Sequence, residues 1–258
     1  MGENRNTLFE KRLRSILNYL DDRYGITIRE AAELNGTSEA TARRDLDEMA
    51  SRKLVVRTHG GAVLPSSHHA ELSQDDKLHK MTDEKERIAE RALELVHDGM
   101  TLFLDSGTTV LTLARRLAEF KNLTIMTTNT DVLSVPMDPS TAVVMTGGVF
   151  RREYRALAGD LAEAFIRGIH VELAFIGIDA IYPEEGVFND NIVELGTKKA
   201  ILQCADRCVA LTDHTKLRKK SLVRICALKD IDTLIMDQDA DEKDLERIQK
   251  EIGDVWLV

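Results

Sequence analysis

Polar and glycine residues follow several apolar runs in the second half of the chain, in a pattern that could bind a small anionic ligand. Asp105-Ser106-Gly107-Thr108-Thr109 comes directly after the run 101–104 and precedes a helical pattern. Such a loop offers a phosphate backbone N–H groups, hydroxyls and a helix N-terminus, although the same residues could simply cap the helix. Comparable residues follow other apolar runs, namely Thr128-Asn129, Gly147-Gly148 with Arg151, 177–179 ending in Asp179, and 213–216 ending in Lys216. Together they predict a site for a small polar ligand with an anionic end.

Glu194 and Lys198 are spaced four residues apart in a helical pattern and could join this site. The same spacing is that of an ordinary surface ion pair, which contributes only about 0.3–0.5 kcal/mol. An enzyme that isomerises sugar phosphates is an alternative, with Glu194, Asp179 or Asp213 transferring the proton and Lys198 or Lys216 holding the phosphate. We expect no catalytic residues, because an isomerase does not explain the first quarter of the chain.

That first quarter carries residues suited to duplex DNA. The candidates are Ser38, Glu39, Thr41, Arg43 and Arg44 on a predicted helix, and Arg57 and His59 on a predicted hairpin. The paired arginines could contact phosphates or donate two hydrogen bonds to guanine, and the other helix residues lie near the helix start, where side chains reach base edges. Arg57 could contact the DNA backbone or could equally be a solvated charge. The alternative function is a small helical interaction module whose charges at 43–45 are only a surface cluster.

Three helices and a hairpin would position these residues. Leu13, Ile16, Leu17 and Leu20 form the stripe of a first amphipathic helix. Thr27-Ile28-Arg29-Glu30 is a capping box that begins a second helix, and Ser38 can cap a third after a tight turn at 35–37. Two short strands around Gly60-Gly61 would form a wing. These elements predict a small α+β winged helix-turn-helix domain over residues 8–64, whose third helix enters a major groove.

The two faces of this third helix have different compositions. Ala42, Leu46 and Met49 share the face that we expect to pack against the domain. The opposite face carries Thr41, Arg44, Asp45 and Glu48, and we expect it to point away from the domain.

The rest of the chain alternates between strand-like and helical segments. Polar residues 65–82 predict a linker, and a helical pattern occupies 83–97. The predicted strands are 101–104, 123–126, 142–145, 173–176, 209–211, 233–236 and 255–258. This alternation predicts an α/β domain over residues 83–258, with an open, mainly parallel sheet and helices on both faces. Ligands bind such sheets beyond the carboxyl ends of the strands, where the polar residues above are found.

Charge and composition limit the class of protein. The net charge is −9, but residues 1–64 carry +1 and the remainder −10, so the acidity does not belong to the predicted DNA-binding part. No apolar run is long enough to cross a membrane, and the N-terminus lacks a secretion signal, so we expect a cytoplasmic protein. Three cysteines and the pair His68-His69 follow no metal-binding spacing. We therefore expect neither a metal nor a cofactor.

Two segments of the first domain resemble the DeoR family of bacterial repressors. Residues 36–46, GTSEATARRDL, and 56–62, VRTHGGA, resemble the family signatures S-E-x-T-I-R-R-D-L and R-T-H-G-G-A. The resemblance continues through 104–109, Thr128-Asn129, 147–151, 191–198 and 213–216, and so covers nearly the whole chain. One departure is Leu217-Arg218, where Phe-Gly is usual.

This resemblance implies a fold, an effector and an assembly. The second domain would be similar to ribose-5-phosphate isomerase and would bind a phosphorylated sugar, with the matching residues as ligands. The protein would be a homodimer or homotetramer and would repress transcription from duplex operator DNA until the effector binds. An activator with the same parts is the alternative, since the sign of regulation depends on where the operator lies.

Overall fold

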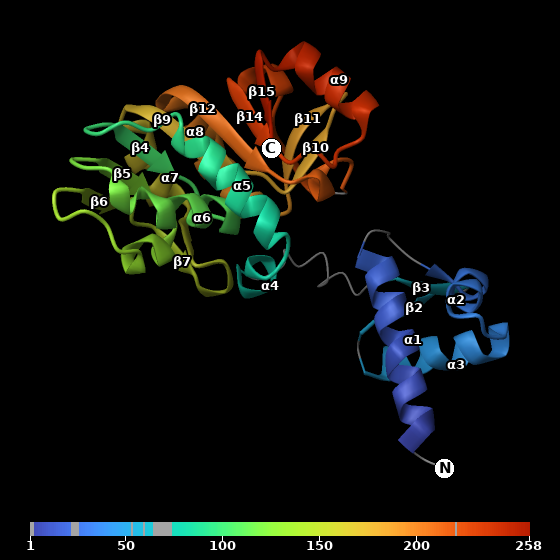
Figure 1. Ribbon diagram of the computed structural model, residues 1–258. Coiled ribbons are helices and arrows are strands. Elements are labelled where there is room, and N and C mark those ends of the chain that lie inside the picture. The colour runs from blue at the N-terminus through green and yellow to red at the C-terminus, as the bar shows by residue number, and fades with distance from the viewer. Residues whose placement is uncertain (1–2, 22–25, 53, 59, 64–73, 220) are drawn as a thin grey trace. The chain divides into compact units, whose positions relative to one another are not determined.

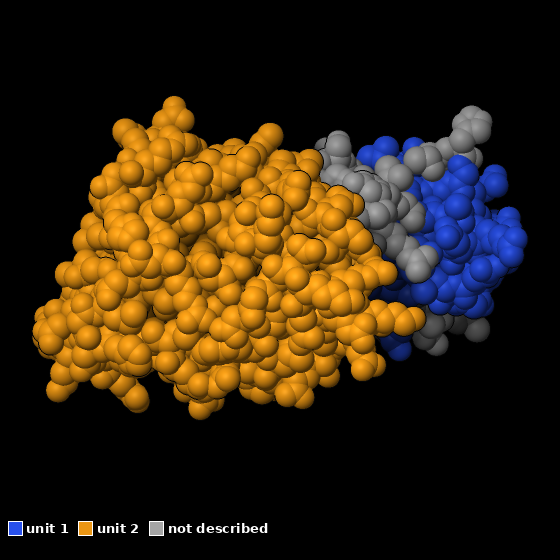
Figure 2. Space-filling model, turned by 90° about the horizontal axis from the view of Figure 1, so that it is seen from above, with its two compact units in different colours: residues 1–71 blue, residues 72–258 orange. Residues whose placement is uncertain are grey.

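A computed structural model describes residues 3–21, 26–52, 54–58, 60–63, 74–219 and 221–258. The chain divides into two compact units, Met1–Glu71 and Leu72–Val258, which we call the first and second units (Figure 2). His59, the pair His68-His69 and the first half of the predicted linker, residues 65–73, lie outside the described residues.

The first unit consists of three helices and a small antiparallel sheet. Its elements are α1 (Glu3–Asp21), β1 (Ile26–Thr27), α2 (Ile28–Asn35), α3 (Glu39–Ser51), β2 (Val56–Thr58) and β3 (Gly61–Val63). The strands pair in the order β1-β3-β2, with the predicted hairpin formed by β2 and β3. Ile16, Leu46 and Met49 are completely buried and join the helices in one core.

The ends of α2 and α3 are fixed by the caps that the sequence predicts. Thr27 Oγ1 accepts a hydrogen bond from the Glu30 N–H (3.1 Å), and Glu30 Oε2 accepts one from the Thr27 N–H (2.8 Å). Gly36 ends α2 with φ +59°, and Ser38 Oγ caps α3 by accepting from the Thr41 N–H (3.2 Å).

Asp45 corrects our assignment of the outer face of α3. We expected its side chain to face outward, but it is 6% exposed and binds Arg12 of α1 through two hydrogen bonds, of 2.6 and 3.0 Å. Asp45 lies three residues after Ala42 and four before Met49, so helical geometry places it on the packed face. The pair therefore ties α3 to α1.

A parallel sheet forms the centre of the second unit (Figure 1). The order of its seven strands is β15-β14-β12-β9-β4-β5-β6, and every neighbouring pair is parallel. Their bounds are β4 (Thr101–Leu104), β5 (Thr124–Thr127), β6 (Ala142–Met145), β9 (Val171–Gly177), β12 (Ala205–Thr212), β14 (Thr233–Met236) and β15 (Asp254–Leu257). Each predicted strand corresponds to one of them, which confirms the predicted α/β fold.

Helices cover both faces of this sheet. On one face lie α5 (Thr82–Leu93) and α6 (Thr108–Arg116), and on the other α7 (Asp160–Arg167), α8 (Leu195–Gln203) and α9 (Glu242–Glu251). Side chains alternate accordingly: in β4, Leu102 and Leu104 pack under α5 and α6, while Phe103 packs on the opposite face. The sheet is thus buried on both sides, and only its strand ends remain for polar chemistry.

Several smaller elements were not predicted. Helix α4 (Gln74–Leu78) lies within the range that we predicted as linker, so residues 74–78 correct that part of the prediction. Strands β7 (Val149–Arg151) and β8 (Ala156–Ala158) form a hairpin, and β10 (Ala180–Tyr182), β11 (Gly186–Asn189) and β13 (Val223–Cys226) form an antiparallel sheet. Short 3-10 turns are η2 (Leu117–Glu119), η3 (Thr130–Ser134), η4 (Arg152–Tyr154), η5 (Ile192–Glu194), η6 (His214–Lys216) and η7 (Leu228–Asp230). Among the described residues, none of the helices has the length and apolar character needed to span a bilayer.

Candidate functional site

A buried ion pair lies at the carboxyl ends of the central strands. Asp105 follows β4 and is 1% exposed, and Lys198 of α8 is 3% exposed. Lys198 Nζ donates to Asp105 Oδ2 (2.5 Å) and to the Gly177 carbonyl oxygen (2.8 Å), while the Gly177 N–H donates to the same carboxylate (3.2 Å). Burial opposes the charged form of Lys198, but Asp105 and Glu194 leave its pKa raised. Asp105 therefore helps to hold Lys198 in its charged form.

The loop after Asp105 presents backbone rather than side chains. Gly107 is the N-cap of α6 with φ +115°, a conformation that favours glycine. No heavy atom lies within 4 Å of the position that a Cβ would take there. A ligand could therefore approach the first N–H groups of α6, and the effector roles of Ser106, Gly107, Thr108 and Thr109 stay predictions.

Three buried polar groups near this pair lack partners. Thr128 Oγ1 and Asn129 Nδ2 follow β5, the strand next to β4, and Thr197 Oγ1 precedes Lys198. Each residue is at most 3% exposed, and within the described chain none of these three atoms has a hydrogen-bond partner. Unpaired buried polar groups are costly and uncommon, and a polar ligand that reached these three atoms could supply the missing hydrogen bonds. Thr197 lies in the matched stretch 191–198, but no pattern of its own singles it out as a ligand.

Glu194 pairs with Arg151 rather than with Lys198. Arg151 Nη1 donates to Glu194 Oε1 (2.9 Å), and Asn189 Nδ2 donates to Glu194 Oε2 (3.3 Å). The arginine comes from the β7–β8 hairpin, where a Cβ on Gly148 would lie 2.7 Å from the Ala158 carbonyl oxygen. Gly148 therefore has a structural reason to be glycine, and the effector roles of Gly147 and Gly148 stay predictions.

Lysines gather around Asp179, which follows β9. Lys77 Nζ lies 3.0 Å from Asp179 Oδ1, and Lys219 Nζ lies 2.7 Å from Asp190 Oδ2. Although burial acts in the opposite direction, Lys77, Lys219 and Lys198 hold the pKa of Asp179 well below its usual range. We call Lys77, Lys85, Lys216 and Lys219 the lysine cluster, because their charges act on one another or on Asp179.

Two members of the lysine cluster, Lys216 and Lys85, have no carboxylate partner among the described residues. Lys216 is half-buried, and its ammonium group has no hydrogen-bond or ion-pair partner within the described residues. Its pKa is lowered by burial and by the positive charges of Lys219 and Lys77, against the opposing effect of Asp213. Lys85 is 5% exposed and donates only to backbone carbonyls, and burial lowers its pKa to about 8. An anion would stabilise both charged forms. Lys77, Lys85 and Lys219 were not predicted from the sequence, because no motif marks them.

One group of side chains could reach a metal ion. The ligand atoms of His214, Asp237 and Asp239 lie within 4.8 Å of one another. His214 Nδ1 is hydrogen-bonded to Asp237 Oδ2 (2.5 Å), and the other carboxylate oxygen accepts from the His214 N–H (2.7 Å). These bonds account for the arrangement without a metal.

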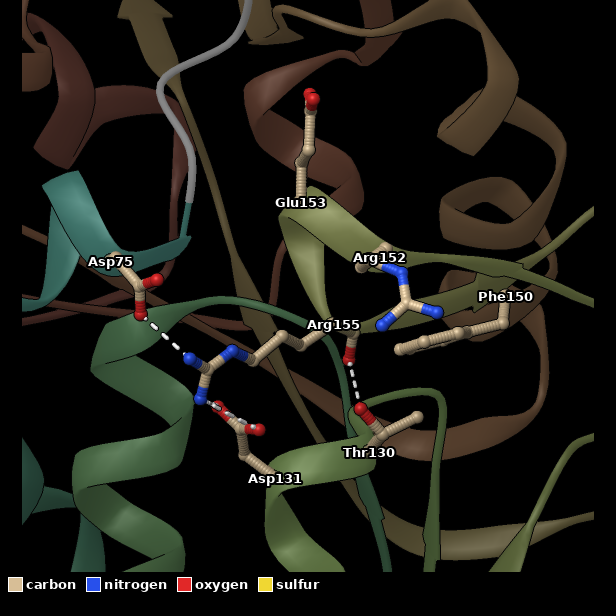
Figure 3. Close-up of a pocket in the computed structure, with 7 residues that line it drawn as sticks. All are labelled: Asp75, Thr130, Asp131, Phe150, Arg152, Glu153 and Arg155. Carbon is tan, nitrogen blue, oxygen red and sulfur yellow. Dashed lines mark hydrogen bonds and ion pairs between the residues drawn. The ribbon is translucent and has the colours of Figure 1, made fainter.

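A shallow pocket beside the β7–β8 hairpin contains none of the predicted effector residues. Its lining is Asp75, Thr130, Asp131, Phe150, Arg152, Glu153 and Arg155 (Figure 3). The Arg155 guanidinium points between two carboxylates, and binds Asp75 (2.8 Å) and Asp131 (3.2 Å). Because the two carboxylates neutralise Arg155, the pocket is a poor site for an anion. The ion pair between Asp75 and Arg155 attaches α4 to the rest of the second unit.

The outer face of α3 carries two unpaired arginines. Arg43 and Arg44 are exposed, and neither guanidinium group has a hydrogen-bond or ion-pair partner in the described part of the chain. Glu39 and the capping residue Ser38 are also exposed, and Thr41 is half-buried. Arg57 differs, because it bonds Asp47 of α3 (2.7 Å) and the Gly61 carbonyl oxygen, so it connects the hairpin to the helix.

Family models match both units. The DeoR-like helix-turn-helix domain matches residues 12–68, and the DeoR C terminal sensor domain matches residues 80–238. Among curated proteins, the HTH-type transcriptional regulator GlpR of Haloferax volcanii is 34% identical over 93% of this chain and 94% of its own. The glycerol-3-phosphate regulon repressor of Escherichia coli K12 is 31% identical over 82% of this chain and 84% of its own. Among solved structures, ribose 5-phosphate isomerase A of Methanocaldococcus jannaschii is 22% identical over 54% of this chain and 56% of its own, with a TM-score of 0.38.

Proposed function

Because this chain belongs to the DeoR family of transcriptional regulators, we propose that it represses a carbohydrate-metabolism operon until a phosphorylated sugar binds its second unit. Helix α3 enters the major groove of the operator, and the second unit binds the effector. A repressor is favoured over an activator because similar proteins are named repressors, of the glycerol-3-phosphate regulon and, putatively, of the aga operon.

The DNA-binding part of this proposal rests on how the arginines of α3 are paired. Among the described residues, the exposed guanidinium groups of Arg43 and Arg44 have no partner, whereas Arg12 and Arg57 are engaged by Asp45 and Asp47. An arginine that already pairs with a carboxylate must give up that ion pair to bind a phosphate, which costs free energy. A guanidinium group without such a partner has no ion pair to give up. Arg43 and Arg44 are therefore the side chains that we assign to phosphate and base contacts. Ser38, Glu39 and Thr41 are proposed neighbours in the interface, and Arg57 supports the wing.

The effector half is supported by the unpaired groups at the carboxyl ends of the strands. The site offers many donors and few acceptors among the described residues. They are the first turn of α6, the atoms of Thr128, Asn129 and Thr197 that have no partner there, and the ammonium of Lys216, which also has none. That balance suits a phosphate with neighbouring hydroxyls. Asp105, Asp179 and Glu194 could accept from hydroxyls of a sugar.

We propose no isomerase activity for this site. Glu194 is bound by Arg151 and Asn189, and Asp179 by Lys77. Asp213 accepts from the Thr215 N–H (3.0 Å). Carboxylate oxygens that already accept these hydrogen bonds have fewer lone pairs left to take a proton from a substrate. A cytoplasmic homodimer or homotetramer, with two copies of α3 at successive half-sites, completes the proposal.

Linked binding tests this function. A fluorescent fragment of the protein's own promoter region is titrated with protein at low salt, without and with each member of a panel of phosphosugars. We expect tight binding that one phosphosugar weakens about 5- to 150-fold, the usual range of such coupling. Calorimetry should then find that operator-bound protein takes up that phosphosugar more weakly by the same factor. Equal uptake by free and operator-bound protein would contradict the release mechanism, and a failure to bind any promoter fragment would contradict the function.

A further inference from the structure

Helix α4 is attached to the second unit at several points. Its first residue, Gln74, is 3% exposed, and the helix packs against α6 and η4. Asp75 binds Arg155 (2.8 Å), and Lys85 Nζ donates to the carbonyl oxygens of Lys77 and Lys80 (2.5 Å each). In the sequence, α4 is also the first element of the second unit after the first unit ends. A change in how α4 is held would therefore reach the chain that leads to the DNA-binding unit.

Lys77 connects α4 directly to the candidate effector site. Its Nζ lies 3.0 Å from Asp179 Oδ1, although the two residues are 102 positions apart. Asp179 follows β9, beside the loop after β4 that holds Asp105. The side chains of Lys77 and Asp179 are only 16% and 11% exposed, so water screens the pair weakly.

The charges around this pair favour an added anion. Lys216 has no partner among the described residues, and the charges of Lys77 and Lys219 oppose its protonation. Lys85 lies near the same charges and bonds only carbonyl oxygens. A phosphate placed beside Lys216 would lessen this repulsion and would attract Lys77. It would also repel the carboxylate of Asp179, so the phosphate and Asp179 compete for one ammonium group.

Asp179 can lose Lys77 without becoming an unpaired buried charge. Its Oδ2 accepts a hydrogen bond from the Asp190 N–H (3.2 Å), and Lys219 and Lys198 act on it electrostatically. Removing the single partner of a buried charge is strongly destabilising, but a carboxylate with further cations nearby avoids most of that cost. The ion pair can therefore open without disrupting the fold.

We propose that Lys77 exchanges partners, binding Asp179 in the empty protein and the phosphate of the effector in the occupied one, and that α4 shifts with it. Lys77 is then a positioning residue that couples the effector to the DNA-binding unit. This proposal rests on the proposed function of the same site. It assigns to Lys77 and Asp179 the coupling that the proposed function requires.

Two substitutions in the full-length protein separate the roles of the pair. Asp179→Asn removes the competitor and keeps the ammonium group, whereas Lys77→Gln removes the ammonium group. Lys80→Gln is the matched control, because Lys80 is exposed and near α4 and the structure gives its side chain no ion pair. Inorganic phosphate is the probe, since it lacks the hydroxyls that Asp179 could otherwise bind. Calorimetry measures phosphate affinity, hydrogen exchange measures the protection of amides 74–80, and thermal unfolding verifies the fold.

If Lys77 exchanges partners, Asp179→Asn and Lys77→Gln should change the affinity for phosphate in opposite directions. Without phosphate, both should lose protection in α4, because both break the ion pair. Asp179→Asn should then bind phosphate about two- to fivefold more tightly and Lys77→Gln more weakly by a similar factor, as expected for one partly buried ion pair. Asp179→Asn should also bind promoter DNA more weakly than wild type without phosphate. In wild type and in Lys80→Gln, phosphate itself should reduce the protection of α4.

Affinity changes in the same direction in both variants would assign the pair a merely structural role and overturn the proposal. The same conclusion would follow if wild-type α4 kept its protection when phosphate was bound, while the proposed function would stand. A wild-type protein that bound neither phosphate nor any phosphosugar would instead overturn the effector site, and the proposal with it.

Discussion

Lys198 Nζ and Asp105 Oδ2 lie 2.5 Å apart with both side chains almost fully buried, so neither charge can lose the other without cost. Lys198→Met should therefore lower the free energy of unfolding by about 3–5 kcal/mol, because it leaves a buried carboxylate unpaired. The double variant Asp105→Asn with Lys198→Met should be more stable than the sum of the single effects predicts. Urea unfolding measures all three variants, and strictly additive losses would contradict this account. For the same reason, Asp105→Ala is an unsuitable test of effector binding.

Arg44→Ala should abolish tight operator binding and leave the fold intact. Arg44 is exposed and has no partner among the described residues, so its removal should change the free energy of unfolding by less than about 1 kcal/mol. A gel shift with promoter DNA measures the loss, and thermal unfolding verifies the fold. Arg116→Ala is the control, because this arginine is exposed on α6 and paired with Glu86. Equal loss in both variants would indicate a general charge effect.

Asp45→Ala should instead act through stability. The carboxylate is 6% exposed and bonds Arg12 twice, so we expect the first unit to lose about 1–3 kcal/mol of unfolding free energy. Operator binding by the folded protein should change little in comparison with Arg44→Ala. A loss of binding at temperatures where the variant is fully folded would contradict this separation of roles.

The sequence predicts the strands of the parallel sheet because each is a short apolar run between polar turns, and burial on both faces requires such runs. Helix α4 escaped prediction because Gln74–Leu78 is short and mostly polar, and its attachment depends on distant residues. Asp45 was assigned to the outer face because it is charged, although its spacing from Ala42 and Met49 fits the packed face. Its partner Arg12, 33 positions earlier, is what no local pattern indicates. The same limit hid Lys77, since nothing near it in sequence indicates Asp179. Local patterns thus find strands, caps and glycine loops, but not long-range charge pairs.

Lys216→Met should remove the response to phosphosugar without lowering stability. The ammonium group of Lys216 is half-buried beside Lys77 and Lys219, so its charge is unfavourable in the empty protein. Loss of a charge-assisted hydrogen bond should weaken phosphosugar binding about tenfold or more. Calorimetry measures the affinity, and Lys199→Met, an exposed neighbour of the buried Lys198, serves as control. Normal induction of the Lys216 variant in a reporter strain would contradict its assignment.

Lys85 should make stability rise with pH in the alkaline range. Its pKa is about 8 in the folded protein and 10.5 when unperturbed, so between these values the unfolded chain binds more protons than the folded one. Its contribution to the free energy of unfolding should therefore increase by about 2 kcal/mol from about pH 7 to about pH 9.5. Lys85→Met should lack this increment when the two proteins are compared by urea unfolding. Parallel pH profiles would show that Lys85 titrates normally.

Two substitutions of Arg218 can distinguish the free energy of its ion pairs from the free energy of its strained backbone. It has φ +52°, a conformation that favours glycine, yet it bonds both oxygens of the buried Asp244 (2.8 and 2.7 Å) and pairs with Glu184. Arg218→Ala loses these bonds and keeps the strained backbone, so we expect a loss of about 1–2 kcal/mol in unfolding free energy. Arg218→Gly loses the same bonds but relieves the backbone, so it should be about 1 kcal/mol more stable than the alanine variant. Urea unfolding of the two variants measures the difference. An alanine variant as stable as the glycine variant would mean that the left-handed backbone at this position stores no strain.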